Sequence, residues 1–66
     1  MPSYFVKVMG EDKGIAFVFD SPVDIKAAIW SDVQTQIFNA TNEIWIRKDE
    51  ETCDPKKMSI IALSKL

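Results

Sequence analysis

Hydrophobic and polar positions alternate in two short segments near the start of the chain. Tyr4–Met9 (YFVKVM) and Ile15–Asp20 (IAFVFD) are rich in aromatic and β-branched residues, which favour strands. Gly10–Gly14 (GEDKG) lies between them with a glycine at each end, a composition typical of turns. The pattern therefore predicts a β-hairpin with a five-residue loop.

A helical pattern follows the hairpin. Ser21 suits an N-cap, Pro22 the first helical position, and Asp24 the acidic position of a capping box. Apolar residues then recur every four residues and form one stripe: Ile25, Ile29, Val33 and Ile37. We predict a helix from Pro22 to about Asn39, ended by the segment 39–42 (NATN), in which an asparagine takes the left-handed cap.

The two large aromatic residues of this helix are not equivalent. Trp30 lies about 60 degrees from the centre of the apolar stripe and is expected at the rim of the core. Phe38 lies about 140 degrees away from the stripe. Two alternatives follow: Phe38 packs against the next strand because the helix ends just before it, or it contacts another chain.

Two further strands are predicted after the helix. Glu43–Lys48 (EIWIRK) has strand composition, Asp49–Lys57 (DEETCDPKK) is a polar loop, and Met58–Leu63 (MSIIAL) is the last strand. In the last strand the alternation does not decide which set faces inward, either Met58, Ile60 and Ala62 or Ile61 and Leu63.

The order of elements is ββαββ, and a right-handed crossover through the helix brings the third strand beside the first. The chain is thus predicted to be one α+β domain, residues 1–66, with a mainly antiparallel four-stranded sheet of order 2-1-3-4 and the helix on one face. Four strands span roughly 19 Å and a helix only about 10 to 12 Å. Either the sheet curls around the helix, or another chain covers the rest.

Alternation also sorts each predicted strand into two faces. The set placed against the helix is apolar: Tyr4, Val6, Val8, Ile15, Phe17, Phe19, Ile44 and Ile46. The opposite set is mixed: Phe5, Lys7, Met9, Ala16, Val18, Asp20, Glu43, Trp45 and Arg47. Within it Phe5, Met9, Val18 and Trp45 can form an apolar patch beside Lys7 and Arg47. Since soluble monomers seldom expose large apolar patches, we predict that this outer face, together with Phe38, binds a partner or a second copy.

Composition supports the need for a partner. The chain has 66 residues, 47% of them hydrophobic, with one cysteine and no histidine, so it forms neither an internal disulfide nor an ordinary zinc site. Small domains without such links are often stabilised by association, and a homodimer is expected here. The single Cys53 and the absence of a long apolar run at the N-terminus favour a cytoplasmic protein.

Candidate chemistry is weak. Asp49, Glu50, Glu51 and Asp54 offer oxygen ligands for calcium, but their spacing fits no EF-hand loop, and a solvated loop is expected instead. No catalytic constellation is present, so we expect no enzyme and no cofactor. The net charge of −2 argues against general nucleic-acid binding.

We therefore expect a non-catalytic protein interaction module. Its small size suggests an inhibitor of the kind encoded by phages or mobile elements, which binds a larger host protein stoichiometrically. The alternative is single-stranded nucleic acid, bound by the aromatics and bases that interleave on the outer face: Phe5, Lys7, Trp45 and Arg47.

Overall fold

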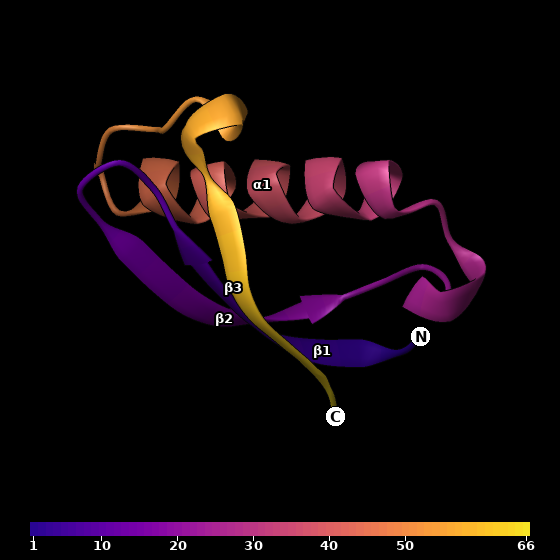
Figure 1. Cartoon of the computed structure of the whole chain (residues 1–66). Helices are drawn as coiled ribbons and strands as arrows, with labels where there is room; N and C mark the ends of the chain where they lie inside the picture. The colour runs from indigo at the N-terminus through magenta and orange to yellow at the C-terminus, as the bar shows by residue number, and fades with distance from the viewer.

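One long helix and three strands make up the computed structural model, which describes all 66 residues (Figure 1). The elements are β1 (Ser3–Met9), β2 (Gly14–Asp20), the 3-10 helix η1 (Ile25–Ala27), α1 (Trp30–Arg47), the 3-10 helix η2 (Pro55–Lys57) and β3 (Ser59–Lys65). The sheet is antiparallel with the order β2-β1-β3. The α+β class and the single helix are confirmed, whereas the sheet has three strands and not four.

The hairpin forms where alternation predicts it. β1 pairs with β2 from Ser3 opposite Asp20 to Met9 opposite Gly14. The Gly10 N–H donates to the Lys13 carbonyl at 2.6 Å and closes the loop. A Cβ atom on Gly14 would lie 2.3 Å from the Met9 sulfur, so glycine leaves the room that the Met9 side chain occupies.

The last strand, β3, pairs with the central strand β1 and forms an edge of the sheet. β3 lies antiparallel to β1, and an irregularity interrupts the pairing, because Lys7 faces Ala62 whereas Val8 faces Ile60. Ile61 is therefore the extra residue of a β-bulge. The bulge shifts the alternation by one position, so that both Ile60 and Leu63 pack against the core. This explains why neither of the two alternating sets is correct for this strand.

The helix begins eight residues later than predicted. The Ser21 hydroxyl donates to the Val23 carbonyl at 2.5 Å, and Asp24 caps η1 by accepting from the Lys26 N–H at 3.0 Å. The predicted N-cap at Ser21 and the capping box are therefore wrong, because Ser21 forms a turn and Asp24 caps a 3-10 helix that precedes α1. α1 itself follows Ile29, whose side chain supplies no cap.

The helix also continues well beyond Asn39, through the segment predicted to end it. Thr41 is buried, and its hydroxyl donates to the Ile37 carbonyl one turn earlier at 2.8 Å. Asn42 does not cap the helix. Its amide group forms two hydrogen bonds of 3.0 Å with the backbone N–H and carbonyl of Cys53, which fix the returning loop along α1.

α1 ends instead at Arg47, with Lys48 as its C-cap, and the following residue, Asp49, adopts a positive φ of 59°. The Glu50 N–H donates to the Trp45 carbonyl at 2.8 Å and the Asp49 N–H to the Ile46 carbonyl at 3.0 Å. These two bonds define a Schellman motif with aspartate in the position that glycine usually takes.

The predicted third strand, Glu43–Lys48, therefore does not exist, and its residues form the last turns of α1. Trp45 is only 2% exposed and continues a buried stripe in which residues recur every four positions: Val33, Ile37, Thr41 and Trp45. Ile46 points to solvent, which corrects its assignment to the inner face. Burying Trp45 on the helix outweighs the strand preference of a short β-branched segment.

The core lies between α1 and the inner face of the sheet. Its members come from all parts of the chain: Tyr4, Val6, Val8, Phe19, Val33, Ile37, Phe38, Trp45 and Met58. The inner sets predicted for β1 and β2 are confirmed. Phe38 is 7% exposed and belongs to this core, whereas Trp30, predicted at its rim, is 46% exposed.

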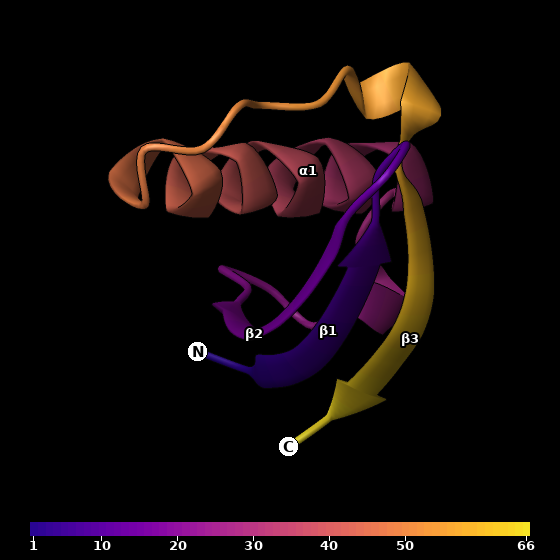
Figure 2. The same cartoon turned by 90° about the vertical axis from the view of Figure 1, so that its left-hand side faces the viewer.

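α1 covers one face of the sheet and no element covers the other (Figures 1 and 2). A sheet of three strands is about 14 Å wide, so one helix about 10 to 12 Å across nearly covers it. The strands also curve around the side on which α1 lies (Figure 2). α1 lacks the combination of length and hydropathy that a membrane-spanning helix requires.

Replacing Trp45 tests the helical register. We expect Trp45→Ala to reduce the free energy of unfolding by about 3 to 5 kcal/mol, because it leaves a large cavity in the core. Ile46→Ala removes the exposed neighbour and should change it by about 0.5 kcal/mol or less. Urea denaturation measures both, and equal losses would contradict the burial of Trp45.

Replacing Asp49 tests the end of the helix. Asp49→Gly should raise the free energy of unfolding by roughly 0.5 to 1 kcal/mol, because glycine adopts the positive φ without strain. Lys48→Gly is the matched control, since Lys48 has a φ of −90° and gains nothing from glycine. A stabilising Lys48→Gly or a destabilising Asp49→Gly would contradict this helix end.

Candidate interaction surface

The uncovered face of the sheet gathers side chains from all three strands. Cross-strand partners share a face, and here Lys7 has Ala16 on one side and Ala62 on the other. Phe5 lies beside Val18 in the same way. We call the following residues the outer face: Phe5, Lys7, Met9, Ala16, Val18, Ile61 and Ala62.

The large apolar residues of the outer face are exposed. Val18 is 56% exposed, Ile61 53% and Phe5 40%, and Met9 is similar to Phe5. The inward neighbours Val6 and Val8 on the same central strand are fully buried. Within the sheet, the exposed large apolar side chains thus lie on one side, and contiguous apolar exposure marks interaction surfaces in soluble proteins. Other exposed apolar residues, Val23, Ile29, Trp30 and Ile46, belong to α1 and to the segment before it.

Lys7 is the only charged residue of this set; Asp20, on the same side of the sheet, lies at its edge opposite Ser3, whose hydroxyl donates to it at 2.5 Å. Lys7 stands on the central strand, and its ammonium group forms no ion pair or hydrogen bond within the chain. Its neighbours across both strand pairings are alanines, whose short side chains leave the sides of the lysine open. Lys7 is therefore an unpaired cation whose nearest cross-strand neighbours are apolar.

The predicted binding residues divide into two groups. Phe5, Lys7, Met9 and Val18 lie together on the outer face as expected. Trp45 and Phe38 are in the core instead, because both belong to the inward side of α1.

Arg47 is also absent from the outer face. It lies in the last turn of α1, on the other side of the sheet, where its guanidinium is 4.0 Å from the Glu43 carboxylate. Ile61 is the outer-face residue that alternation left undecided, since the bulge interrupts the alternation between Ile60 and Ala62.

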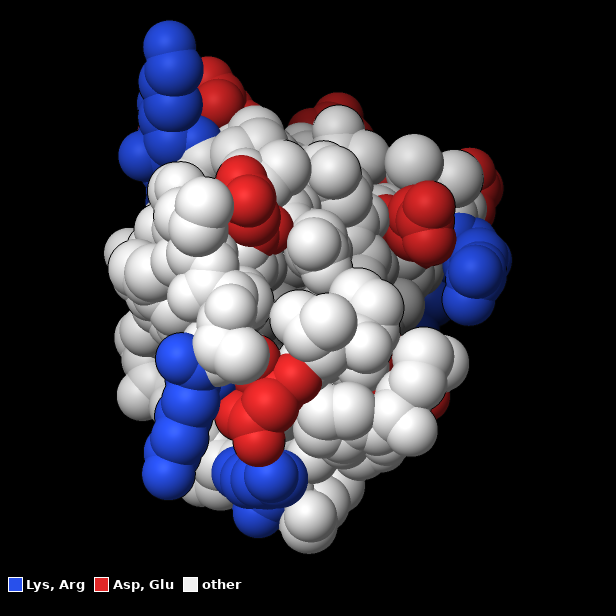
Figure 3. All heavy atoms as spheres, turned by 90° about the vertical axis from the view of Figure 1, so that its right-hand side faces the viewer, with Lys and Arg blue, Asp and Glu red and all other residues white.

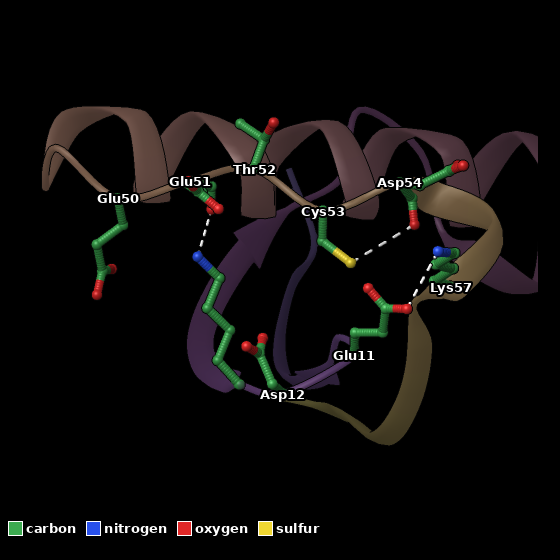
Figure 4. Close-up of a pocket in the computed structure, with 9 residues that line it drawn as sticks. Glu11, Asp12, Glu50, Glu51, Thr52, Cys53, Asp54 and Lys57 are labelled. Carbon is green, nitrogen blue, oxygen red and sulfur yellow. Dashed lines mark hydrogen bonds and ion pairs between the residues drawn. The ribbon is translucent and has the colours of Figure 1, made fainter.

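A second surface feature is a hollow between the β1–β2 loop and the loop that follows α1 (Figure 4). Its volume is about 380 Å³ and its lining is largely charged: Glu11, Asp12, Lys13, Glu50, Glu51, Thr52, Cys53, Asp54 and Lys57. No three acidic, cysteine or histidine side chains of the chain are arranged to hold a metal ion.

The polar groups of this hollow bind one another. Lys57 pairs with Glu11 at 3.1 Å, and the Lys13 ammonium donates to the Glu51 carbonyl (Figure 4). Lys13 also lies 4.4 Å from the centre of the Trp45 ring, in cation–π geometry. These contacts connect the hairpin loop to the end of α1 and to the loop that follows it. The charged groups of the hollow therefore stabilise the fold, since they already bind one another.

At the opposite end of the molecule, acidic and basic side chains are interspersed among broad uncharged areas (Figure 3). Asp24 accepts from the Lys65 ammonium at 2.8 Å, from the Lys26 N–H at 3.0 Å and from the Tyr4 hydroxyl at 3.3 Å. The hydrogen bond from Lys65, followed by that from Lys26, lowers the pKa of Asp24 from 3.8 to about 2. The bond to Asp24 in turn raises the pKa of Lys65.

Comparisons of the chain with protein-family models, curated proteins and solved structures gave no match.

The Asp24 pair predicts a dependence of stability on pH. Because the pKa of Asp24 is lower in the folded protein, its contribution is complete above pH 3.8 and is lost as the pH falls towards 2. We expect Asp24→Asn to flatten the fall in the urea midpoint between pH 4 and 2, relative to the wild type. The exposed loop variant Asp12→Asn is the control and should follow the wild type. Parallel curves for all three proteins would contradict the pairing.

Proposed function

We propose that the chain is a non-catalytic protein interaction module that binds a larger protein through its outer face. The observation that carries this proposal is the exposed group of Phe5, Met9, Val18 and Ile61 on a sheet face that no part of the chain covers. Burial of such apolar area is the main favourable term in protein association. A small domain that acts by binding alone is suited to stoichiometric inhibition of its partner.

The remaining surface offers less for binding. The outward side of α1 carries Asp32, Gln36, Asn39 and Glu43. The exposed apolar residues Ile29, Trp30 and Ile46 lie at the two ends of the helix, so they form no continuous apolar surface along it. The hollow beside Cys53 is occupied by ion pairs and hydrogen bonds of its own residues. The apolar outer face is therefore the surface best suited to a protein partner.

Single-stranded nucleic acid is less well supported as a ligand. Nucleic-acid binding to a sheet relies on aromatic rings for base stacking and on several bases for phosphates. Only Phe5 and Lys7 of the four residues expected for this role share the outer face, because Trp45 is buried and Arg47 lies on α1.

Photo-crosslinking tests the proposal. A photoreactive amino acid at Val18, in the outer face, is compared with one at Gln36, on the exposed side of α1. In lysate of the native host we expect a discrete protein adduct from position 18 and none from position 36. Unlabelled wild-type protein should compete for the adduct, and the Val18→Asp variant should not.

The same preparation distinguishes the alternatives. The proposed face would be overturned if only position 36 gave an adduct. It would also be overturned if unlabelled Val18→Asp competed for the adduct at position 18 as well as unlabelled wild-type protein does. Binding of single-stranded oligonucleotides that weakens steeply with salt and is lost in Lys7→Ala would favour nucleic acid instead.

A further inference from the structure

The geometry points to one kind of partner element: an amphipathic helix whose apolar stripe carries an aspartate or glutamate opposite Lys7. This inference rests on the proposed function, because it concerns the same outer face. The inference specifies the shape and the charge of the partner element that binds the outer face. The exposed apolar residues alone determine neither.

The dimensions of the sheet favour a helix. Three strands span about 14 Å and a helix with side chains about 10 to 12 Å, so one helix nearly covers the face. α1 already makes this packing on the inner side, over the same three strands. A strand added to an edge of the sheet would leave Phe5 and Met9 on the central strand uncovered.

The position of Lys7 favours a carboxylate. A partner that covers Phe5, Val18, Met9 and Ile61 also covers Lys7, because Lys7 lies on the central strand among them. Lys7 has no acidic partner in the chain, so its ammonium would lose water without compensation unless the partner supplies an acid. The open space beside Ala16 and Ala62 admits such a side chain.

A second copy of the chain fits this face poorly. Two outer faces packed about a central two-fold axis would bring Lys7 of each copy together, and like charges oppose that contact. Packing α1 of another copy on the face would bury its polar outward side, including Asp32, Gln36, Asn39 and Glu43, which lacks an apolar stripe. The occupant is therefore a different protein, although a homodimer is the expectation from size alone.

Selection from a peptide library tests this inference. The library consists of helical 18-residue peptides with a fixed apolar stripe and one randomised position at its centre, selected separately on wild type and on Lys7→Glu. We expect aspartate or glutamate at that position from the wild type, and lysine or arginine from Lys7→Glu. For a matched pair of glutamate and lysine peptides, Lys7→Glu should weaken the former by about tenfold or more and strengthen the latter.

Three measurements complete the test. Amide NMR shifts should map bound peptides to the outer face, and Val18→Asp should abolish binding of both peptides. If circular dichroism shows that Lys7→Glu is unfolded, Lys7→Met takes its place and should remove the preference for glutamate. Sedimentation should give a monomer at all concentrations.

Several outcomes would overturn the inference. Outer-face binding without a charge preference rejects the carboxylate but leaves the proposed function intact. The same inference fails if no peptide is selected, if the shifts map elsewhere, or if the protein forms a dimer that Val18→Asp dissociates. The proposed function is decided separately by the crosslinking experiment, and it fails if position 18 yields no protein adduct or if Val18→Asp competes for the adduct as well as the wild type does.

Discussion

Trp45 lies where the far end of α1, the hairpin loop and the loop after the helix meet. Its ring is buried beneath the Lys13 ammonium, and its carbonyl accepts the bond that ends the helix. Because Trp45 is buried on a helix, α1 extends to Arg47, and only the segment after η2 remains to complete the sheet. The number of strands follows from this one burial. One helix nearly covers one face of a three-stranded sheet, and the opposite face of this sheet is covered by no other element.

Local pattern was sufficient for the parts of the fold in which neighbours in sequence are also neighbours in space. The hairpin and its inner face follow from alternation around the Gly10–Gly14 turn. The end of the helix does not, because it depends on distant contacts. Asn42 resembles a cap in the sequence, yet its amide binds the backbone of Cys53. Asp49 takes the left-handed position without the glycine that would have marked it.

The candidate surface was predictable to the same extent. Phe5, Lys7, Met9 and Val18 share a face because β1 and β2 are regular, whereas Ile61 joins them only through a bulge that alternation cannot reveal. Trp45 and Arg47, which were expected on this face, are absent from it because their segment is part of α1 and not a strand. The chemistry of the outer face therefore differs from the prediction. Two bases and two large aromatic rings were expected, whereas the outer face has one large ring and one base, Phe5 and Lys7, among smaller apolar residues.

The strand order also has a consequence for how the chain folds during synthesis. β1 precedes the other two strands in the chain but lies at the centre of the sheet, between β2 and β3. The β1–β2 hairpin can form early, yet one edge of β1 stays unpaired until residues near Lys65 leave the ribosome. Sheets closed by such distant pairings fold slowly, and open edges invite association. Until β3 pairs with it, the free edge of β1 is a strand edge to which another chain can add.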